Sequence, residues 1–162
     1  LAGIFLLAAC ETAPNATGDA AGTSASGSTT ASSSGSDAAG SGSGEMTINE
    51  ELISIGDRVL FDFDSYELSS SAKSVLNDQA TFLASNPSVR ITIEGHCDER
   101  GTREYNLALG ESRASATRDY LVAQGVNPAR IKTISYGKER PAVIGSNEDA
   151  WRHNRRSVSV IN

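Results

Sequence analysis

The sequence predicts an α+β fold of two layers, with helices packed over one face of a mixed β-sheet. Within residues 46–162, short stretches of alternating apolar residues are separated by longer stretches whose apolar residues recur every three or four positions, as in strands and helices respectively. Ser or Asn residues stand just before two of the helical stretches and suit helix N-caps. Residues 11–45, by contrast, hold no aromatic or branched aliphatic side chain. We therefore expect one compact domain with the order β-α-β-α-β-α-β, preceded by a tether.

The segment before the domain is of low complexity. In residues 11–45, 29 of 35 positions are Gly, Ser, Ala or Thr, and there are four carboxylates but no Lys or Arg. Such a composition cannot bury enough apolar surface to offset the entropy of ordering, so we expect a disordered tether. A flexible coil of this length has a root-mean-square span of ~33 Å and reaches ~120 Å when extended.

The chain begins with nine apolar or small residues, 1–9, followed by Cys10. This stretch is far shorter than the ~20 residues that span a bilayer, and it matches the end of a signal-peptide hydrophobic region. Leu7-Ala8-Ala9-Cys10 resembles a bacterial lipobox, which implies that residues 1–9 are a truncated signal peptide and that Cys10 is acylated. The resemblance implies a diacylglycerol thioether and an N-acyl group on Cys10, and three acyl chains together make a stable membrane anchor. An ordinary secretory signal with a chance Cys, or a buried N-terminal strand, is the alternative. Glu11, in place of Asp, favours the outer membrane.

The first half of the domain contains two expected strands and one helix. Residues 58–64 alternate around two aromatics and predict a strand. The serines at 69–71 offer N-caps for a helix that ends at 86–87, an Asn-Pro pair. Residues 89–93 alternate again and predict a strand with one solvent-facing side. The apolar stripe of the helix consists of Ala72, Val75, Leu76, Ala80 and Leu83.

The second half repeats the pattern after a loop at residues 95–102. A helix follows and stops at Gly125, and residues 131–136 predict a third strand. A short helix begins after Asn147, and a last strand covers residues 158–161. The apolar stripe of the longer helix consists of Leu107, Gly110, Ala114, Thr117 and Leu121.

Charge and cysteine content exclude several classes of protein. The chain has 14 basic and 20 acidic residues, and since four of the acidic ones belong to the tether, the domain is nearly neutral. It therefore lacks the basic footprint of a nucleic-acid binder and a polybasic lipid-binding patch. Cys10 and Cys97 are the only cysteines and stand more than 80 residues apart, which argues against a disulfide framework or a zinc finger.

Four fragments at consistent spacing resemble the OmpA-like peptidoglycan-binding family. They cover residues 95–101 (GHCDERG), 105–114 (YN, then LGESRA), 135–143 (SYGKERPAV) and 154–156 (NRR). The resemblance extends over residues 59–161 and implies a wall-binding domain without a cofactor, a metal or catalysis. Cys97 departs from the Ala or Thr that the family more often has there.

The family resemblance also implies partners and a location. The lipobox and tether match the lipoproteins of this family, whose partner is the Tol system's periplasmic protein TolB, with a role in envelope constriction at division. The chain would then link the outer membrane, through lipid on Cys10, to peptidoglycan on the periplasmic side. The runner-up is a wall-binding lipoprotein outside the Tol system.

The resemblance places the ligand site around Asp98 and Arg113. The ligand is the diaminopimelate of the peptidoglycan stem peptide, whose side chain ends in an ammonium and a carboxylate, so the site needs both charges. The planar guanidinium of Arg suits a carboxylate because it donates two parallel hydrogen bonds. Phe63 and Asp64 line the pocket by resemblance, beside Cys97, and Asp64 reaches the same edge if the first two strands run in parallel. We expect Asp98 and Arg113 to be exposed.

Plainer interpretations of these residues exist. An Asp after a strand is often a turn former, and Arg113 beside Glu111 could belong to a solvated helix face. Tyr105 and Trp151 are expected in the core or at the rim of the pocket. Residues 154–156 are expected to connect the last helix to the sheet, and a contact with the glycan is the alternative.

The competing class is an enzyme, a metal- or thiol-dependent wall hydrolase. Its candidate residues are His96, Cys97, Asp98, Glu99 and His153. Adjacent residues on an extended loop point in alternating directions and cannot all face one metal, and no H-E-x-x-H pattern is present. We therefore expect a binding domain and no enzyme.

Overall fold

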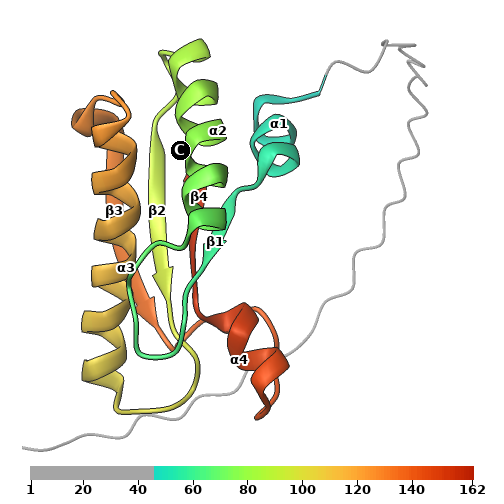
Figure 1. The fold of residues 1–162 in the computed structure, drawn as a ribbon, viewed down its shortest axis with the longest axis vertical. Helices are drawn as coiled ribbons and strands as arrows, with labels where there is room; N and C mark the ends of the chain where they lie inside the picture. Colours follow the sequence, from blue (N-terminus) through green and yellow to red (C-terminus); the bar gives the residue numbers. More distant parts are fainter. Residues whose placement is uncertain (1–45) are drawn as a thin grey trace, which may run out of the picture. The chain divides into compact units, whose positions relative to one another are not determined.

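The computed structural model describes residues 46–162, so the lipobox with Cys10 and the tether at 10–45 lie outside the described residues. The described part is an α+β domain, as the sequence predicts, with two long helices packed against one face of a four-stranded sheet (Figure 1). Its elements are α1 (Ile48–Ile55), β1 (Arg58–Leu60), α2 (Ser70–Ser85), β2 (Ile91–His96), α3 (Arg103–Ala123), η1 (Pro128–Arg130), β3 (Ile131–Gly137), α4 (Glu148–Asn154) and β4 (Arg156–Ile161).

The sheet is mixed, with the strand order β1-β4-β2-β3. β4 pairs antiparallel with both β1 and β2, and β2 pairs in parallel with β3. β1, β2 and β3 therefore run in the same direction, and the ends of β1 and β2 lie at the same edge of the sheet. The sequence predicted that Asp64 would reach the same sheet edge as Asp98 if the first two strands run in the same direction, and they do.

The first strand is shorter than the sequence predicts. β1 ends at Leu60 rather than at Asp64, because its neighbour β4 begins only at Arg156 and offers no pairing partner beyond it. One further backbone hydrogen bond, from the Phe61 N–H to the Arg155 carbonyl at 2.9 Å, ends the pairing. Asp64 has a positive φ of 53°, so the chain turns away from the sheet here and forms a loop instead of a longer strand.

Local capping explains where the helices begin. Ser69, Thr102 and Asn147 are the N-caps of α2, α3 and α4, and each side chain accepts a hydrogen bond from the backbone N–H three residues later. α1 was not expected from the sequence, although Thr47 and Glu50 form a complete capping box at its start. Among residues 46–162, no helix has the length and apolar character needed to cross a membrane.

The core lies between the sheet and the two long helices. Leu76 and Leu83 of α2, Ile91 and Ile93 of β2 and Leu121 of α3 are at most 1 % exposed. The inward side of β4 is polar: the Ser159 hydroxyl donates to Gln79 Oε1 at 2.8 Å, and the hydroxyls of Thr117 and Ser157 are 2.7 Å apart. These buried polar groups are hydrogen-bonded to one another, so burial leaves them satisfied.

α3 crosses β2 at a point where both elements have a glycine. A Cβ atom on Gly95 would lie 1.9 Å from the Gly110 carbonyl oxygen, so the backbones approach as closely as backbones can. The β2–β3 register also shifts between Gly95 and His96. This contact fixes the height of α3 above the sheet and thereby the position of the side chains that follow β2.

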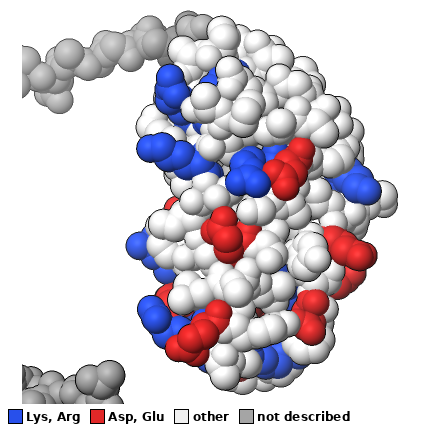
Figure 2. Space-filling model, turned by 90° about the vertical axis from the view of Figure 1, so that its left-hand side faces the viewer, with Lys and Arg blue, Asp and Glu red and all other residues white. Residues whose placement is uncertain are grey.

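The charged side chains do not separate into a basic and an acidic face on the side of the domain that lies to the left in Figure 1. Figure 2 shows Lys and Arg interspersed with Asp and Glu there. This distribution agrees with the nearly neutral composition of the domain and gives nucleic acid or anionic lipid no extended field to follow on this face.

Candidate ligand-binding site

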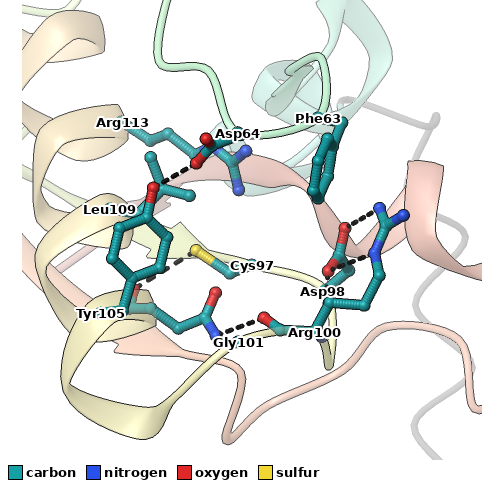
Figure 3. Close-up of a pocket in the computed structure, with 10 residues that line it drawn as sticks. Phe63, Asp64, Cys97, Asp98, Arg100, Gly101, Tyr105, Leu109 and Arg113 are labelled. Carbon is teal, nitrogen blue, oxygen red and sulfur yellow. Dashed lines mark hydrogen bonds and ion pairs between the residues drawn. The ribbon is translucent and has the colours of Figure 1, made fainter.

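A small cavity of about 160 Å³ lies where β1 and β2 end and α3 begins (Figure 3). It receives side chains from three segments: the loop after β1, the loop after β2, and one side of α3. The lining residues are Phe63, Asp64, Cys97, Asp98, Arg100, Gly101, Tyr105, Asn106, Leu109 and Arg113. The cavity therefore contains two carboxylates and two guanidinium groups.

The first turns of α3 form one wall of the cavity. Tyr105, Leu109 and Arg113 are spaced four residues apart, so they lie on one side of the helix. Asn106 fixes the preceding loop, since its side-chain amide donates to the Arg100 carbonyl at 2.7 Å and to the Thr102 carbonyl at 3.0 Å. The helix and the loop after β2 are thus joined as one unit.

Arg113 is fully buried, so the expectation that it is exposed on a helix face is wrong. Its guanidinium donates to three backbone carbonyls: Ser65 at 2.8 Å, His96 at 2.9 Å and Asp62 at 3.1 Å. Arg113 thereby ties the loop after β1 to the end of β2. Burial lowers the pKa of the Arg113 guanidinium, which nevertheless stays protonated as Arg does in proteins. Two of its five N–H groups are not used in these bonds.

Asp98 is also buried, with 4 % exposure, which contradicts the expected exposed loop position. Arg100 donates to it from its backbone N–H and Nε, both to Oδ1 at 3.1 Å, and from Nη2 to Oδ2 at 2.6 Å. Arg155 adds a contact from Nη1 to Oδ2 at 3.3 Å. Burial by itself raises the pKa of Asp98, but these hydrogen bonds outweigh it and lower the pKa below its ordinary value.

Arg100 is a site residue that the sequence analysis missed. Its guanidinium lies between the Phe63 ring, 4.1 Å from the centroid, and the Trp151 ring, 4.0 Å from the centroid. The Trp151 indole N–H donates to Glu99 Oε1 at 3.1 Å. Three segments that are distant in the sequence thus meet at the Arg100 guanidinium. No spacing of residues within one segment predicts such a stack.

Asp64 stands at the open side of the cavity. It is exposed, and the Tyr105 hydroxyl forms a short hydrogen bond to its Oδ1, which raises the pKa of Tyr105. Phe63 is 60 % exposed and lies on the side of the cavity away from Tyr105 (Figure 3). Tyr105 is itself about half exposed, so it belongs to the rim of the cavity, whereas Trp151 covers Arg100.

Cys97 and His96 are both buried, and only one of them reaches the cavity. The Cys97 thiol lies in the cavity wall and contacts the Asn106 carbonyl oxygen at 3.3 Å, and burial raises its pKa, which keeps it protonated. His96 packs against the Tyr136 ring at 5.6 Å. Burial, with the nearby positive charges of Arg156 and Arg140, lowers its pKa to about 4, so the imidazole is neutral at pH 7.

The five predicted site residues therefore line one cavity, although two of them are less accessible than expected. The hydrolase candidates do not gather in the same way: Cys97 and Asp98 line the cavity, while His96, Glu99 and His153 do not. Within residues 46–162, no three His, Cys, Asp or Glu side chains are grouped so as to hold a metal ion.

A larger groove of about 550 Å³ lies between β1, the start of α2, and α4. Its basic residues are either exposed or already paired: Arg58 binds its neighbour Asp57 at 2.7 Å, and Arg155 binds Asp98 and Glu148. We regard the smaller cavity as the candidate site despite its size, because all five residues that the resemblance predicts for the ligand site line it, whereas none of them lines the larger groove.

Taken together, the fold and the cavity define an α+β domain with a charge-lined pocket at the sheet edge. A family model described as the OmpA family matches residues 60–155, so the chain belongs to this family. The resemblance predicted from the sequence is thereby confirmed.

Individual relatives are similar over the same region. The peptidoglycan-associated lipoprotein of Rhizobium meliloti is 54% identical over 109 residues, which cover 67% of this chain and 62% of that protein. The peptidoglycan-associated lipoprotein of Pasteurella multocida is 46% identical over 100 residues, which cover 62% of this chain and 67% of that protein. The alignment with the Rhizobium protein thus spans less than two thirds of that relative.

Solved structures agree on the fold. The crystal structure of the peptidoglycan-associated lipoprotein from Burkholderia pseudomallei matches with a TM-score of 0.64 at 44% identity, covering 65% of this chain and 90% of that one. The C-terminal domain of Helicobacter pylori MotB matches with a TM-score of 0.61 at 20% identity, covering 65% of this chain and 84% of that one. The latter likeness concerns the fold alone.

Proposed function

We propose that this chain binds the peptide stem of peptidoglycan, without chemical conversion, in the cavity between the two loops and α3. The single observation that supports this best is the charge composition of the cavity. Two carboxylates, Asp64 and Asp98, line a space of about 160 Å³ together with two guanidinium groups, those of Arg100 and Arg113. The site therefore combines groups of the kind that bind an ammonium with groups of the kind that bind a carboxylate. A zwitterionic amino-acid head group has both.

Diaminopimelate is the stem-peptide residue with such a head group at the end of its side chain. In the proposed complex, its ammonium binds at Asp98, its carboxylate lies toward the Arg113 guanidinium, and Phe63, Asp64 and Cys97 surround the carbon chain. The relatives named above are described as associated with peptidoglycan, which agrees with this assignment. A lysine side chain ends in an ammonium but has no carboxylate on the same carbon, so it would bind at Asp98 and leave the Arg113 side of the site without a partner.

Isothermal titration with two tripeptides tests the proposal: Ala-γ-Glu-diaminopimelate and the same peptide with lysine. We expect the diaminopimelate peptide to bind at least about tenfold more tightly, since a charged hydrogen bond is worth ~1.5–3 kcal/mol. The variant Asp98→Asn should lose about 2–5 kcal/mol of binding free energy, because it leaves the ligand's ammonium without a counter-charge. Equal affinity for both peptides, or unchanged binding by a natively folded Asp98→Asn, would contradict the assignment.

We further propose that Cys10 is acylated and holds the protein at the outer membrane, with the domain in the periplasm. The supporting features are the Leu7–Cys10 lipobox, Glu11 after it, and the small polar residues of the tether. In cell fractionation, the Cys10→Ala variant should move from the membrane to the soluble periplasmic fraction. Sedimentation of Cys10→Ala with the membranes would count against a lipid anchor.

We also propose that the protein acts within the Tol system, with TolB as its partner, and so supports envelope integrity and constriction at cell division. This proposal rests on the similarity to the peptidoglycan-associated lipoproteins of several bacteria. A pull-down with TolB tests it directly. A protein that binds peptidoglycan but retains no TolB would instead be a wall-binding lipoprotein outside the Tol system.

A further inference from the structure

The carboxylate of Asp98 has no acceptor position left for a ligand. Oδ1 accepts two hydrogen bonds from Arg100, and Oδ2 accepts one from Arg100 and one from Arg155. An ionised carboxylate offers about four lone-pair sites, and all four are occupied. An ammonium group can therefore bind Asp98 only if one of these donors leaves.

The donors differ in how firmly they are fixed. Arg155 is nearly buried and also donates to the Phe61 carbonyl at 3.1 Å and to Glu148 at 2.7 Å. The backbone N–H of Arg100 is part of the loop. The Arg100 side chain, by contrast, is 32% exposed and makes its ionic contacts in this site to Asp98 alone. It is the donor that can leave while Asp98 stays in position.

Departure of the Arg100 side chain would also open the stack. Its guanidinium separates the Phe63 ring from the Trp151 ring, as Figure 3 shows on the Phe63 side. Trp151 is retained by its bond to Glu99, whereas Phe63 belongs to the exposed rim. Loss of the stack would therefore free Phe63 and change the electric field at the indole of Trp151.

We propose that the Arg100 side chain is an internal occupant of the ammonium subsite and competes with the ligand for Asp98. Arg100 thereby determines affinity: a ligand binds only if its ammonium replaces the guanidinium at the carboxylate. This inference rests on the proposed function, because it assumes a ligand with an ammonium at Asp98.

The test compares the full chain with two variants that each remove one positive charge. Arg100→Gln removes the competitor. Arg103→Gln is the matched control, because Arg103 is exposed, forms an ion pair with Glu139 at 3.2 Å, and does not line the cavity. Calorimetry with the diaminopimelate tripeptide should give about tenfold tighter binding for Arg100→Gln and unchanged affinity for Arg103→Gln.

Fluorescence gives a second measurement that needs no variant. Trp151 is the only tryptophan of the chain, so its emission reports on the cation beside it. In the wild-type protein the emission should shift upon titration with the tripeptide and saturate together with the calorimetric signal, and Arg100→Gln should not show this shift.

The outcomes separate the two proposals. If the wild type binds but Arg100→Gln binds equally well or more weakly, or if wild-type emission stays constant during binding, Arg100 is no competitor and the inference is overturned while the proposed function stands. If neither the wild type nor either variant binds the tripeptide, the proposed function fails and this inference with it.

Discussion

Replacing Arg113 with alanine is expected to lower the free energy of unfolding by about 3–5 kcal/mol, in addition to any loss of binding. The side chain is fully buried, and its three hydrogen bonds reach carbonyls in two segments that precede it by 17 to 51 residues. Alanine would leave these carbonyls without their donor and a void under the loop after β1.

Urea unfolding followed by circular dichroism measures this effect. Arg118→Ala is the matched control on the same helix, because Arg118 binds only its neighbour Asp119 near the surface, and it should change stability by less than about 0.5 kcal/mol. An Arg113→Ala protein as stable as this control would show that the hydrogen bonds of the buried guanidinium do not stabilise the fold.

Replacing Gly95 with alanine is expected to destabilise the fold by at least about 3 kcal/mol, at the upper end of overpacking effects. The added methyl group would lie 1.9 Å from the Gly110 carbonyl oxygen. The carbonyl oxygen is backbone, and a Cβ has no rotation that would move it away from its own backbone. α3 must therefore move away from β2, and the cavity wall formed by Tyr105 and Arg113 must move with it.

Gly110→Ala provides the comparison for Gly95→Ala. Its Cβ would meet the Ser135 hydroxyl at 2.3 Å, a side chain that can rotate away, and the Gly95 carbonyl oxygen at 3.1 Å, a far smaller backbone overlap than the 1.9 Å contact of Gly95→Ala. Alanine is also favoured over glycine in a helix by about 1 kcal/mol. Thermal unfolding should therefore rank Gly95→Ala well below Gly110→Ala. If the order is reversed, the close approach of the two backbones is not what fixes the helix.

The sequence predicted those parts of the fold that follow from local pattern and capping. Ser69 and Asn147 cap the helices as expected, and the parallel direction of β1 and β2 brings Asp64 and Asp98 to one edge. The end of β1 was not predictable in this way, because it depends on where its neighbour β4 begins, almost a hundred residues later.

The sequence predicted five of the ten residues that line the cavity, but it did not predict how accessible they are. Asp98 and Arg113 line the same cavity, yet their burial depends on partners that no local spacing indicates. Arg113 is covered by the loop after β1, and Asp98 is enclosed by Arg100 and Arg155. For the same reason Arg100 was missed, since its stack forms only once Trp151 has folded back over the loop after β2.

A crystal structure of the protein with the diaminopimelate tripeptide is the most direct test of the central claim, which is that charges of both signs bind one amino-acid head group between α3 and the two loops. We predict electron density for the head group in this cavity, with its ammonium within hydrogen-bond distance of Asp98 and its carboxylate on the side of Arg113. Density for the peptide elsewhere, such as the larger groove beside β1, with the cavity unchanged, would contradict the account.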